Sequence, residues 1–155
     1  MAFRLGIALR DAGHAITKIW CRRRDAGEKL VSILNSEGGE AAYTDNLADL
    51  LDAEIIVLAV SDNAINEMAT KLAAEAANST LSGAPIVLHT SGATAIDALE
   101  PLISRGIPCG VLWPMMTLSK NKNLDFKEAP LLIEHQDEET GAILKEIAFS
   151  LRCEH

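Results

Sequence analysis

The chain has 155 residues, of which 48% are apolar, and its formal net charge is −8. This size and composition predict one compact domain with its own core. The acidic charge argues against binding to nucleic acid or an anionic membrane surface, because both need a clustered positive field. The longest apolar run, residues 55–60, is too short to cross a membrane, and the first residues lack a signal-peptide pattern, so we expect a cytoplasmic protein.

Cysteines and histidines form no pattern typical of a metal site or of a disulfide framework. Cys21, Cys109 and Cys153 are odd in number and far apart, and the four histidines show no HxxxH or HExxH spacing. We therefore expect no bound metal and a reducing compartment.

The first 14 residues predict a helix that ends at Gly13, where a helix C-cap favours glycine. A short strand is expected directly after it, at residues 15–20. In dinucleotide-binding folds this order follows a strand and a GxGxxG loop, and the cofactor pyrophosphate rests on the helix N-terminus. Neither the strand nor the loop is in the sequence. We therefore expect a fragment that begins inside a βαβ unit; the alternative is a shorter α/β domain whose first element is a helix.

Strands and helices alternate through the rest of the chain. Strands are expected at residues 40–44, 53–60, 85–89, 108–113 and 130–134, and helices at 25–36, 46–51, 61–77, 94–104 and 137–151. The alternation predicts an α/β, Rossmann-like, doubly wound parallel sheet whose first strand and glycine loop are missing. We expect residues 1–155 to form a single NAD(P)-binding domain.

Three consecutive arginines, Arg22, Arg23 and Arg24, follow the strand expected at residues 15–20. In dinucleotide folds this position meets the adenosine ribose, where an acidic residue selects NAD and arginine accommodates the 2′-phosphate of NADP. The arginines therefore favour NADP. The alternative is a solvated basic patch, with Asp25 as the N-cap of the next helix.

Two further groups of candidate cofactor-binding residues follow the strands expected at residues 53–60 and 85–89. They are Ala59, Val60 and Ser61, expected along the nicotinamide ribose, and His89, Thr90, Ser91 and Gly92, expected near the reactive ring. Ligands of open α/β sheets bind at the carboxyl ends of strands. The alternatives are structural: Ser61 or Asp62 as a helix N-cap, a capping box at residues 94–97, and a histidine that only satisfies a backbone partner.

The segment WPMMTLSK at residues 113–120 is an apolar loop with a terminal cation. It forms either one wall of a substrate pocket, with Lys120 facing a carboxylate, or a packed loop beneath a surface lysine. No GxSxG, P-loop or kinase pattern occurs, so the sequence does not favour a hydrolase or a phosphotransferase.

Several segments together resemble an uncharacterised family of Rossmann-domain proteins assigned as NADP-dependent oxidoreductases. They are AFRLGIALRDAGH, AVSDNAI, HTSGAT, WPMMTLSK and DFKEAPLLIE. That family is similar in its N-terminal domain to pyrroline-5-carboxylate reductase and to deazaflavin-dependent NADP reductases. The resemblance implies an initial strand with a GxGN-type loop, and a helical C-terminal domain, absent here, through which a homodimer forms.

The sequence thus predicts the NADP-binding domain of an oxidoreductase that transfers hydride between the nicotinamide and a small carbonyl, imine or hydroxy-acid substrate. Its expected partners are the cofactor NADP and this small-molecule substrate. The alternative is a non-catalytic nucleotide-sensing or scaffolding domain. None of the candidate residues is assigned a catalytic role.

Overall fold

A computed structural model describes residues 1–80, 83–115 and 129–151, and its strands form two sheets. Strand β1 (Lys18–Trp20) pairs in parallel with β2 (Ala42–Thr44). The larger sheet has the order β3-β4-β5-β6, with bounds Ile55–Leu58, Ile86–His89, Cys109–Pro114 and Leu131–His135. Strands β3, β4 and β5 are parallel, and β6 is antiparallel to β5.

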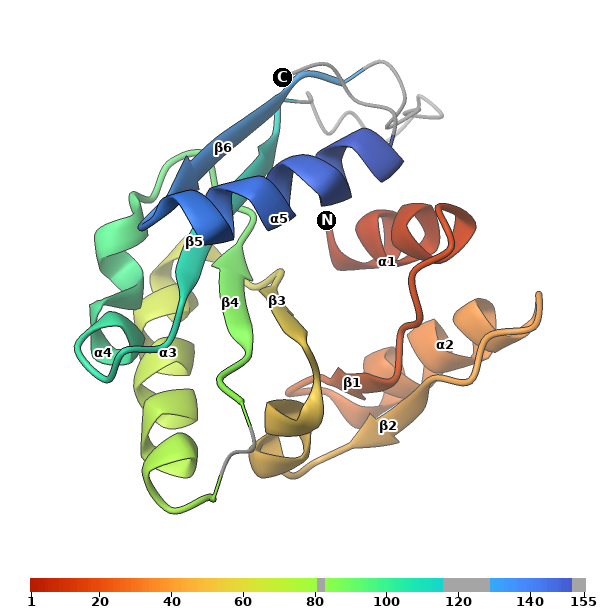
Figure 1. Cartoon of the computed structure of the whole chain (residues 1–155). Helices are drawn as coiled ribbons and strands as arrows, with labels where there is room; N and C mark the ends of the chain where they lie inside the picture. Colours follow the sequence, from red (N-terminus) through yellow and green to blue (C-terminus); the bar gives the residue numbers. More distant parts are fainter. Residues whose placement is uncertain (81–82, 116–128, 152–155) are drawn as a thin grey trace.

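The division of the sheet lies between β1 and β3. Within the residues described, β1 pairs only with β2, and β3 pairs only with β4. In the Rossmann strand order the central strand would stand at this point. The expected parallel, Rossmann-like arrangement is therefore confirmed for the strands on either side of this position. Within the described residues no strand joins the two sheets, and Figure 1 shows them set apart.

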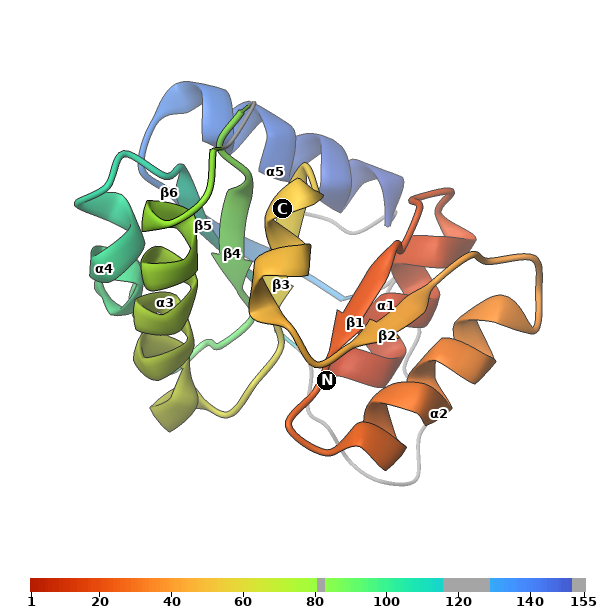
Figure 2. The same ribbon diagram turned by 90° about the horizontal axis from the view of Figure 1, so that it is seen from below.

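Helices cover both faces of the larger sheet (Figures 1 and 2). Helices α1 (Ala2–Asp11) and α5 (Glu138–Ser150) contribute to a core against β4, β5 and β6. On the other face, α3 (Asp62–Ala77), α4 (Glu100–Ile103) and the 3-10 helices η1 (Leu47–Asp52) and η2 (Ile96–Leu99) pack against β3, β4 and β5.

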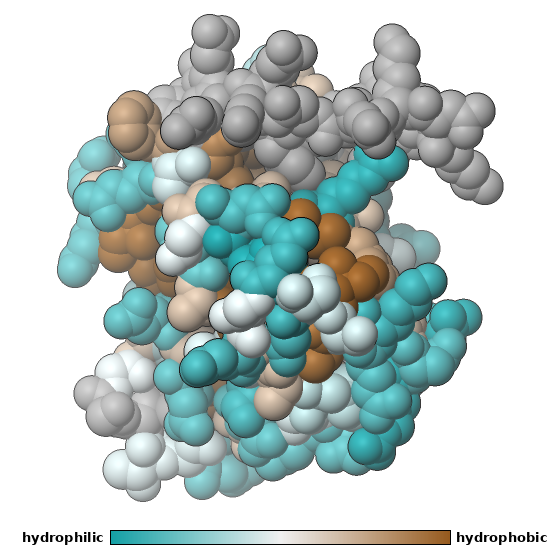
Figure 3. Space-filling model, turned by 90° about the vertical axis from the view of Figure 1, so that its right-hand side faces the viewer, coloured by the Kyte–Doolittle hydropathy of each residue, from teal (hydrophilic) through white to brown (hydrophobic). Residues whose placement is uncertain are grey.

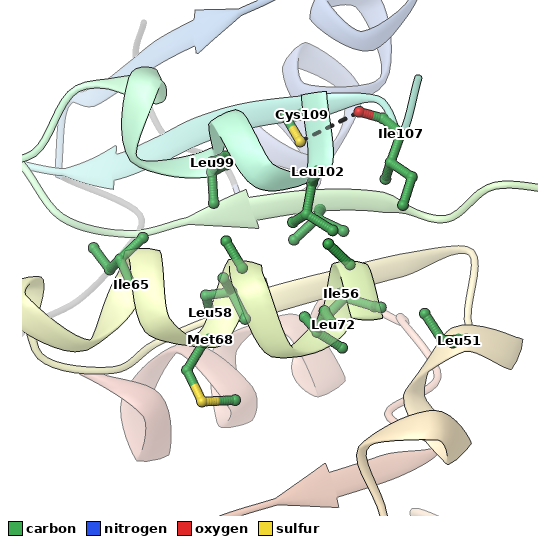
Figure 4. Close-up of a cluster of buried hydrophobic side chains, with 13 residues drawn as sticks. Leu51, Ile56, Leu58, Ile65, Met68, Leu72, Leu99, Leu102, Ile107 and Cys109 are labelled. Atoms are coloured by element: carbon green, nitrogen blue, oxygen red, sulfur yellow. Dashed lines mark hydrogen bonds between the residues drawn. The ribbon is translucent and has the colours of Figure 1, made fainter. Parts of the chain in front are cut away.

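The core follows from alternation along the strands. In β4, Val87 belongs to the cluster under α3, whereas the next residue, Leu88, belongs to the cluster under α5. Successive side chains of a strand point to opposite faces. Because β4 is buried throughout, both faces must be apolar. Figure 4 shows the α3 side of this core, in which Leu72, Leu99 and Leu102 are fully buried.

Helix α2 (Arg24–Asn35) packs against α1 and β1 in a third apolar cluster. Leu30 and Leu34 of α2 are buried there beside Phe3 and Ile7 of α1. Figure 3 views this side of the molecule, where brown, apolar atoms lie among teal, polar ones. Helix α1 thus joins the two sheets, because it contributes to the α5 core and to the α2 core.

Residues 94–104 do not form the single helix expected from the sequence. They fold as η2 followed by the short helix α4, with Pro101 in its first turn. Proline lacks the N–H that a continuous helix would need at this position, but it is tolerated in a first turn. The expected capping box at residues 94–97 is also wrong, because the N-cap position of η2 is Ala95.

A cleft of about 490 Å³ separates the two sheets. Backbone and side chains of β1, including Ile19 and Trp20, line one side, and β3 lines the other. Leu5 and Leu9 of α1 and Met68 of α3 also line it. Apolar residues of both strands therefore line the cleft, which lies between the edges of β1 and β3.

No helix among the described residues is long and apolar enough to span a membrane.

Candidate functional site

Two of the predicted groups of residues lie together at the carboxyl ends of β3 and β4. Leu58, the last residue of β3, is in register with His89, the last residue of β4. Ala59, Val60 and Ser61 therefore leave the sheet beside Thr90, Ser91 and Gly92. This is the edge at which open α/β sheets bind ligands.

Residues 59–61 pass directly from β3 into α3. Ser61 stands at the N-cap position with extended backbone, but its side chain makes no capping hydrogen bond. Its hydroxyl is exposed at the start of the helix, where backbone N–H groups and the helix dipole favour a negative or polar ligand atom. The expected ligand contact by Ala59, Val60 and Ser61 stays a prediction, and the N-cap position is Ser61 rather than Asp62.

His89 organises the turn that follows β4. The ring is fully buried, its Nδ1 accepts the backbone N–H of Ser91 at 3.2 Å, and its Nε2 lies 3.3 Å from the carbonyl oxygen of Ala95. Because Nδ1 accepts, the ring proton is on Nε2 and is donated to Ala95. Burial lowers the pKa of His89, which keeps the ring neutral. Both nitrogens are thus engaged within the turn.

The same turn is closed by two hydroxyl groups and by Gly92. Ser91 Oγ lies 3.1 Å from Thr94 Oγ1 and accepts the N–H of Ala93 at 3.1 Å. A side chain at Gly92 would overlap the indole ring of Trp113 on β5. Glycine therefore lets the turn lie flat against Trp113. Ligand binding by His89, Thr90, Ser91 and Gly92 stays a prediction.

The three arginines, called the arginine loop below, leave β1 and enter α2. Arg22, Arg23 and Arg24 are all exposed. Arg23 pairs with Asp25 at 3.2 Å, and Arg24 pairs with Glu28 at 2.8 Å. The expected N-cap role of Asp25 is wrong: Arg23 holds the N-cap position, and Asp25 lies in the first turn of α2.

Tyr43 on β2 supports the arginine loop and was not predicted from the sequence. Its ring centroid is 5.2 Å from Cζ of Arg24, and its hydroxyl donates to the carbonyl oxygen of Cys21 at 3.3 Å. Tyr43 lies near the carboxyl end of β1 because β2 is the adjacent parallel strand. The sequence pattern did not reveal this pairing, so it gave no signal for Tyr43.

The first turn of α1 has the features of an anion site. It contains no acidic residue, and its N-cap position makes no side-chain hydrogen bond. Arg4 lies in this turn, and its Nη1 is buried without a hydrogen-bond partner among the described residues. Free N–H groups at a helix N-terminus together with a guanidinium suit phosphate oxygens.

The cleft between the sheets is lined by residues that neighbour these groups in the sequence. Ala2 of α1, Trp20 at the end of β1, and Ala59 and Val60 after β3 all line it. Arg22 also lies close enough to α3 to lower the pKa of Glu67, although the Lys71 ammonium is the larger cause. Residues of α1, the end of β1 and the end of β3 thus line the same cleft, whereas Arg22, Arg23 and Arg24 are not among its described lining residues.

Residues 116–128 lie outside the described residues, and with them the predicted contact of Lys120. Among the residues that are described, no group of three or more His, Cys, Asp or Glu side chains is arranged to hold a metal ion.

Comparisons with solved structures find the same fold in proteins described as oxidoreductases, reductases and dehydrogenases. A candidate NADP oxidoreductase of Bacteroides fragilis is 28% identical, with a TM-score of 0.76 over 97% of this chain and 53% of that chain. A pyrroline-5-carboxylate reductase of Coxiella burnetii is 14% identical, with a TM-score of 0.70 over 98% and 53% of the two chains. A prephenate dehydrogenase of Aquifex aeolicus, solved with hydroxyphenyl propionate and NAD+, is 15% identical, with a TM-score of 0.71 over 96% and 53%.

The chain spans about half the length of these solved structures. A search of the curated proteins found no match. The family model that describes a Rossmann-like domain matches residues 2–114, which include α1, the arginine loop and strands β1 to β5. The chain therefore belongs to the family of Rossmann-like domains.

Proposed function

We propose that this chain is the cofactor-binding domain of an NADP-dependent oxidoreductase. The observation that carries the proposal is the arginine loop at the end of β1, where three guanidinium groups are exposed and Arg24 is held over Tyr43. A Rossmann domain places the adenosine ribose at this point. The Bacteroides fragilis protein, described as a candidate NADP oxidoreductase, supports the same cofactor.

The described residues fit a dinucleotide in three places. The arginine loop would hold the 2′-phosphate, the first turn of α1 with Arg4 would face the pyrophosphate, and residues 59–61 would line the nicotinamide ribose. The cleft between the sheets is lined by Ala2 of α1, Trp20 at the end of β1, and Ala59 and Val60 after β3. Each place offers groups of the type that its part of the cofactor needs: guanidinium for phosphate, backbone N–H groups for the pyrophosphate, and backbone with a hydroxyl for the ribose.

The domain supplies binding and orientation. When bound, the nicotinamide supplies the hydride. His89 is neutral and fully hydrogen-bonded within its own turn, so it shapes the carboxyl edge of β4. The general acid and the substrate-binding groups, for a small carbonyl, imine or hydroxy acid, would come from elsewhere in the enzyme. A homodimer would form through the helical domain that the family resemblance implies.

The test compares the binding of NADPH and NADH by this chain. Binding is measured by fluorescence energy transfer from Trp20 and Trp113 to the reduced nicotinamide. We expect tighter binding of NADPH by about ten-fold or more, because one charge-assisted hydrogen bond to a phosphate contributes roughly 1.5–3 kcal/mol. Replacing Arg22, Arg23 and Arg24 by Gln should remove this preference and leave NADH affinity unchanged.

Arg105 provides a matched control. It is also exposed, and it follows the end of α4, far from β1 in the sequence. Its replacement by Gln should leave both affinities unchanged. Equal binding of NADPH and NADH by the unaltered chain would contradict the choice of NADP. Binding of neither would contradict the cofactor-binding role of the chain on its own.

A further inference from the structure

Tyr43 makes one contact with the connection between β1 and α2 and two with the start of α2. Its ring lies 5.2 Å from Cζ of Arg24, and its hydroxyl donates to the carbonyl oxygen of Cys21. At Gly27, in the first turns of α2, a Cβ would come within 2.6 Å of the Tyr43 ring. The ring therefore rests against the backbone of α2 while it holds the beginning and the end of the arginine loop.

Arg24 is shared between the Tyr43 ring and Glu28. Its Nε donates to Glu28 Oε1 at 2.8 Å, and this hydrogen bond is the largest cause that raises the pKa of Arg24. No other hydrogen bond joins the Arg24 side chain to the described part of the chain. The two Nη atoms of its guanidinium are thus free to donate, and the ring contact leaves them free because it uses the face of the guanidinium rather than its edge.

We propose that Tyr43 and Glu28 together set the preference for a 2′-phosphate, Tyr43 by positioning the guanidinium of Arg24 and Glu28 by competing with the phosphate for it. This inference rests on the proposed function. A long exposed side chain loses rotamer freedom when it binds an anion, and the Tyr43 ring has already restricted it. Glu28 acts in the opposite direction, because its carboxylate occupies Nε and adds a negative charge beside the incoming phosphate.

The contact can be tested without any nucleotide, because Tyr43 is the one tyrosine of the chain. Incorporation of 3-fluorotyrosine gives a single 19F resonance that reports on this ring. We expect Arg24→Gln to shift the resonance, since it removes the cation above the ring, and Arg105→Gln to leave it in place. An unmoved resonance in Arg24→Gln would overturn the inference at its first step.

The preference is then measured with 2′,5′-ADP and 5′-AMP, which differ by the 2′-phosphate. We expect Tyr43→Leu to weaken 2′,5′-ADP binding by about two- to five-fold, the size of an exposed cation–π contact, and to leave 5′-AMP binding unchanged. Tyr43→Phe keeps the ring and should behave as the unaltered chain. Glu28→Gln, on the exposed surface of α2, should strengthen 2′,5′-ADP binding by a similar factor.

Each other outcome decides against the inference. An equal loss for both nucleotides in Tyr43→Leu would mean that the ring contacts the adenosine or that the fold is disturbed. An unchanged 2′,5′-ADP affinity in Glu28→Gln would overturn the competing role of Glu28. If the fluorine resonance responds to Arg24→Gln but the unaltered chain binds neither nucleotide, the proposed function fails and the phosphate role of Tyr43 fails with it, while the Tyr43–Arg24 contact stands.

Discussion

His89 illustrates how a buried polar residue can make folding depend on pH. Its Nδ1 must be unprotonated to accept the N–H of Ser91, and burial lowers its pKa below the usual 6.5, against smaller opposing effects of the Ala95 carbonyl, Glu134 and Asp62. In the unfolded chain the ring takes up a proton near its ordinary pKa, so the unfolded state binds more protons in this range. The stabilising effect is present above pH 6.5 and is lost as the pH falls through the folded-state pKa.

We therefore expect the free energy of unfolding, measured by urea titration, to decrease between pH 7.5 and pH 5.5. In His89→Asn, whose side-chain oxygen can still accept the N–H of Ser91, this decrease should be smaller. Equal slopes for the two proteins would show that another group controls the stability in this pH range.

Gly92 is required by the ring of Trp113. Because an added Cβ would overlap the indole, Gly92→Ala should destabilise the domain by about 1–3 kcal/mol, the usual cost of overpacking. Chemical denaturation monitored by tryptophan fluorescence measures this cost. Gly83 provides the control, since nothing lies within 4 Å of a Cβ there, and Gly83→Ala should change stability by less than about 0.5 kcal/mol.

The sequence identified most of the residues at the strand ends but not their partners. The HTSG segment was placed correctly at the carboxyl end of β4, because an apolar run followed by polar residues can be recognised in the sequence. The hydrogen bond from His89 to Ala95 and the overlap between Gly92 and Trp113 depend on tertiary packing. Tyr43 was missed for the same reason, because its contact with Arg24 crosses from one strand to the end of its neighbour.

Arg10 connects the first two helices. Its guanidinium donates to the carbonyl oxygens of Ile33 at 3.0 Å and Leu34 at 3.4 Å, and it pairs with Glu37 and Asp11. A cation at the end of α2 complements the negative end of the helix dipole. The side chain is 14% exposed, so its hydrogen bonds are partly protected from water.

We expect Arg10→Met to lower the free energy of unfolding by about 1–2 kcal/mol, because it keeps the aliphatic part and removes the hydrogen bonds to the end of α2. Arg105→Met is the matched control and should have almost no effect. The measurement is urea denaturation at low and high salt. A loss that disappears at high salt would show that only the exposed pairs with Asp11 and Glu37 contribute.

At the level of elements, the sequence was sufficient to predict a helix or strand wherever the spacing of apolar residues within that segment is typical of it. In the described part of the chain, helices α1, α2, α3 and α5 and strands β1 to β6 occur at the expected segments, because their apolar spacing matches their structure; α2, β5 and β6 each extend one residue beyond the expected bounds. The segment 94–104 differed because Pro101 divides it. The antiparallel direction of β6 was not readable, since strand direction depends on the connection rather than on the strand's own residues.

The two sheets give the whole molecule two levels of stability. Strand β4 has hydrogen-bonded neighbours on both sides, whereas β1 and β3 each have one. Local openings have lower free energies where fewer contacts hold a segment. We expect native-state hydrogen exchange at low urea to show β1, β2 and α2 opening together before β4 and β5.

Exchange of all six strands at one common free energy would show that α1 and the cleft-lining side chains couple the two sheets completely. Addition of NADPH should raise the protection of β1 more than that of β5, if the arginine loop binds the cofactor. The same experiment therefore reports on the coupling between the sheets and on the ligand.

The interval between β1 and β3 has a consequence for the behaviour of the protein in solution. Each of these strands has an edge whose backbone N–H and C=O groups are not hydrogen-bonded to a neighbouring strand within the described residues, and the cleft between them is apolar. Such edges can pair with strands of other molecules. We expect the chain to self-associate as its concentration rises, which sedimentation velocity would detect as a growing weight-average mass. If the cleft binds the cofactor, addition of NADPH should reduce this self-association.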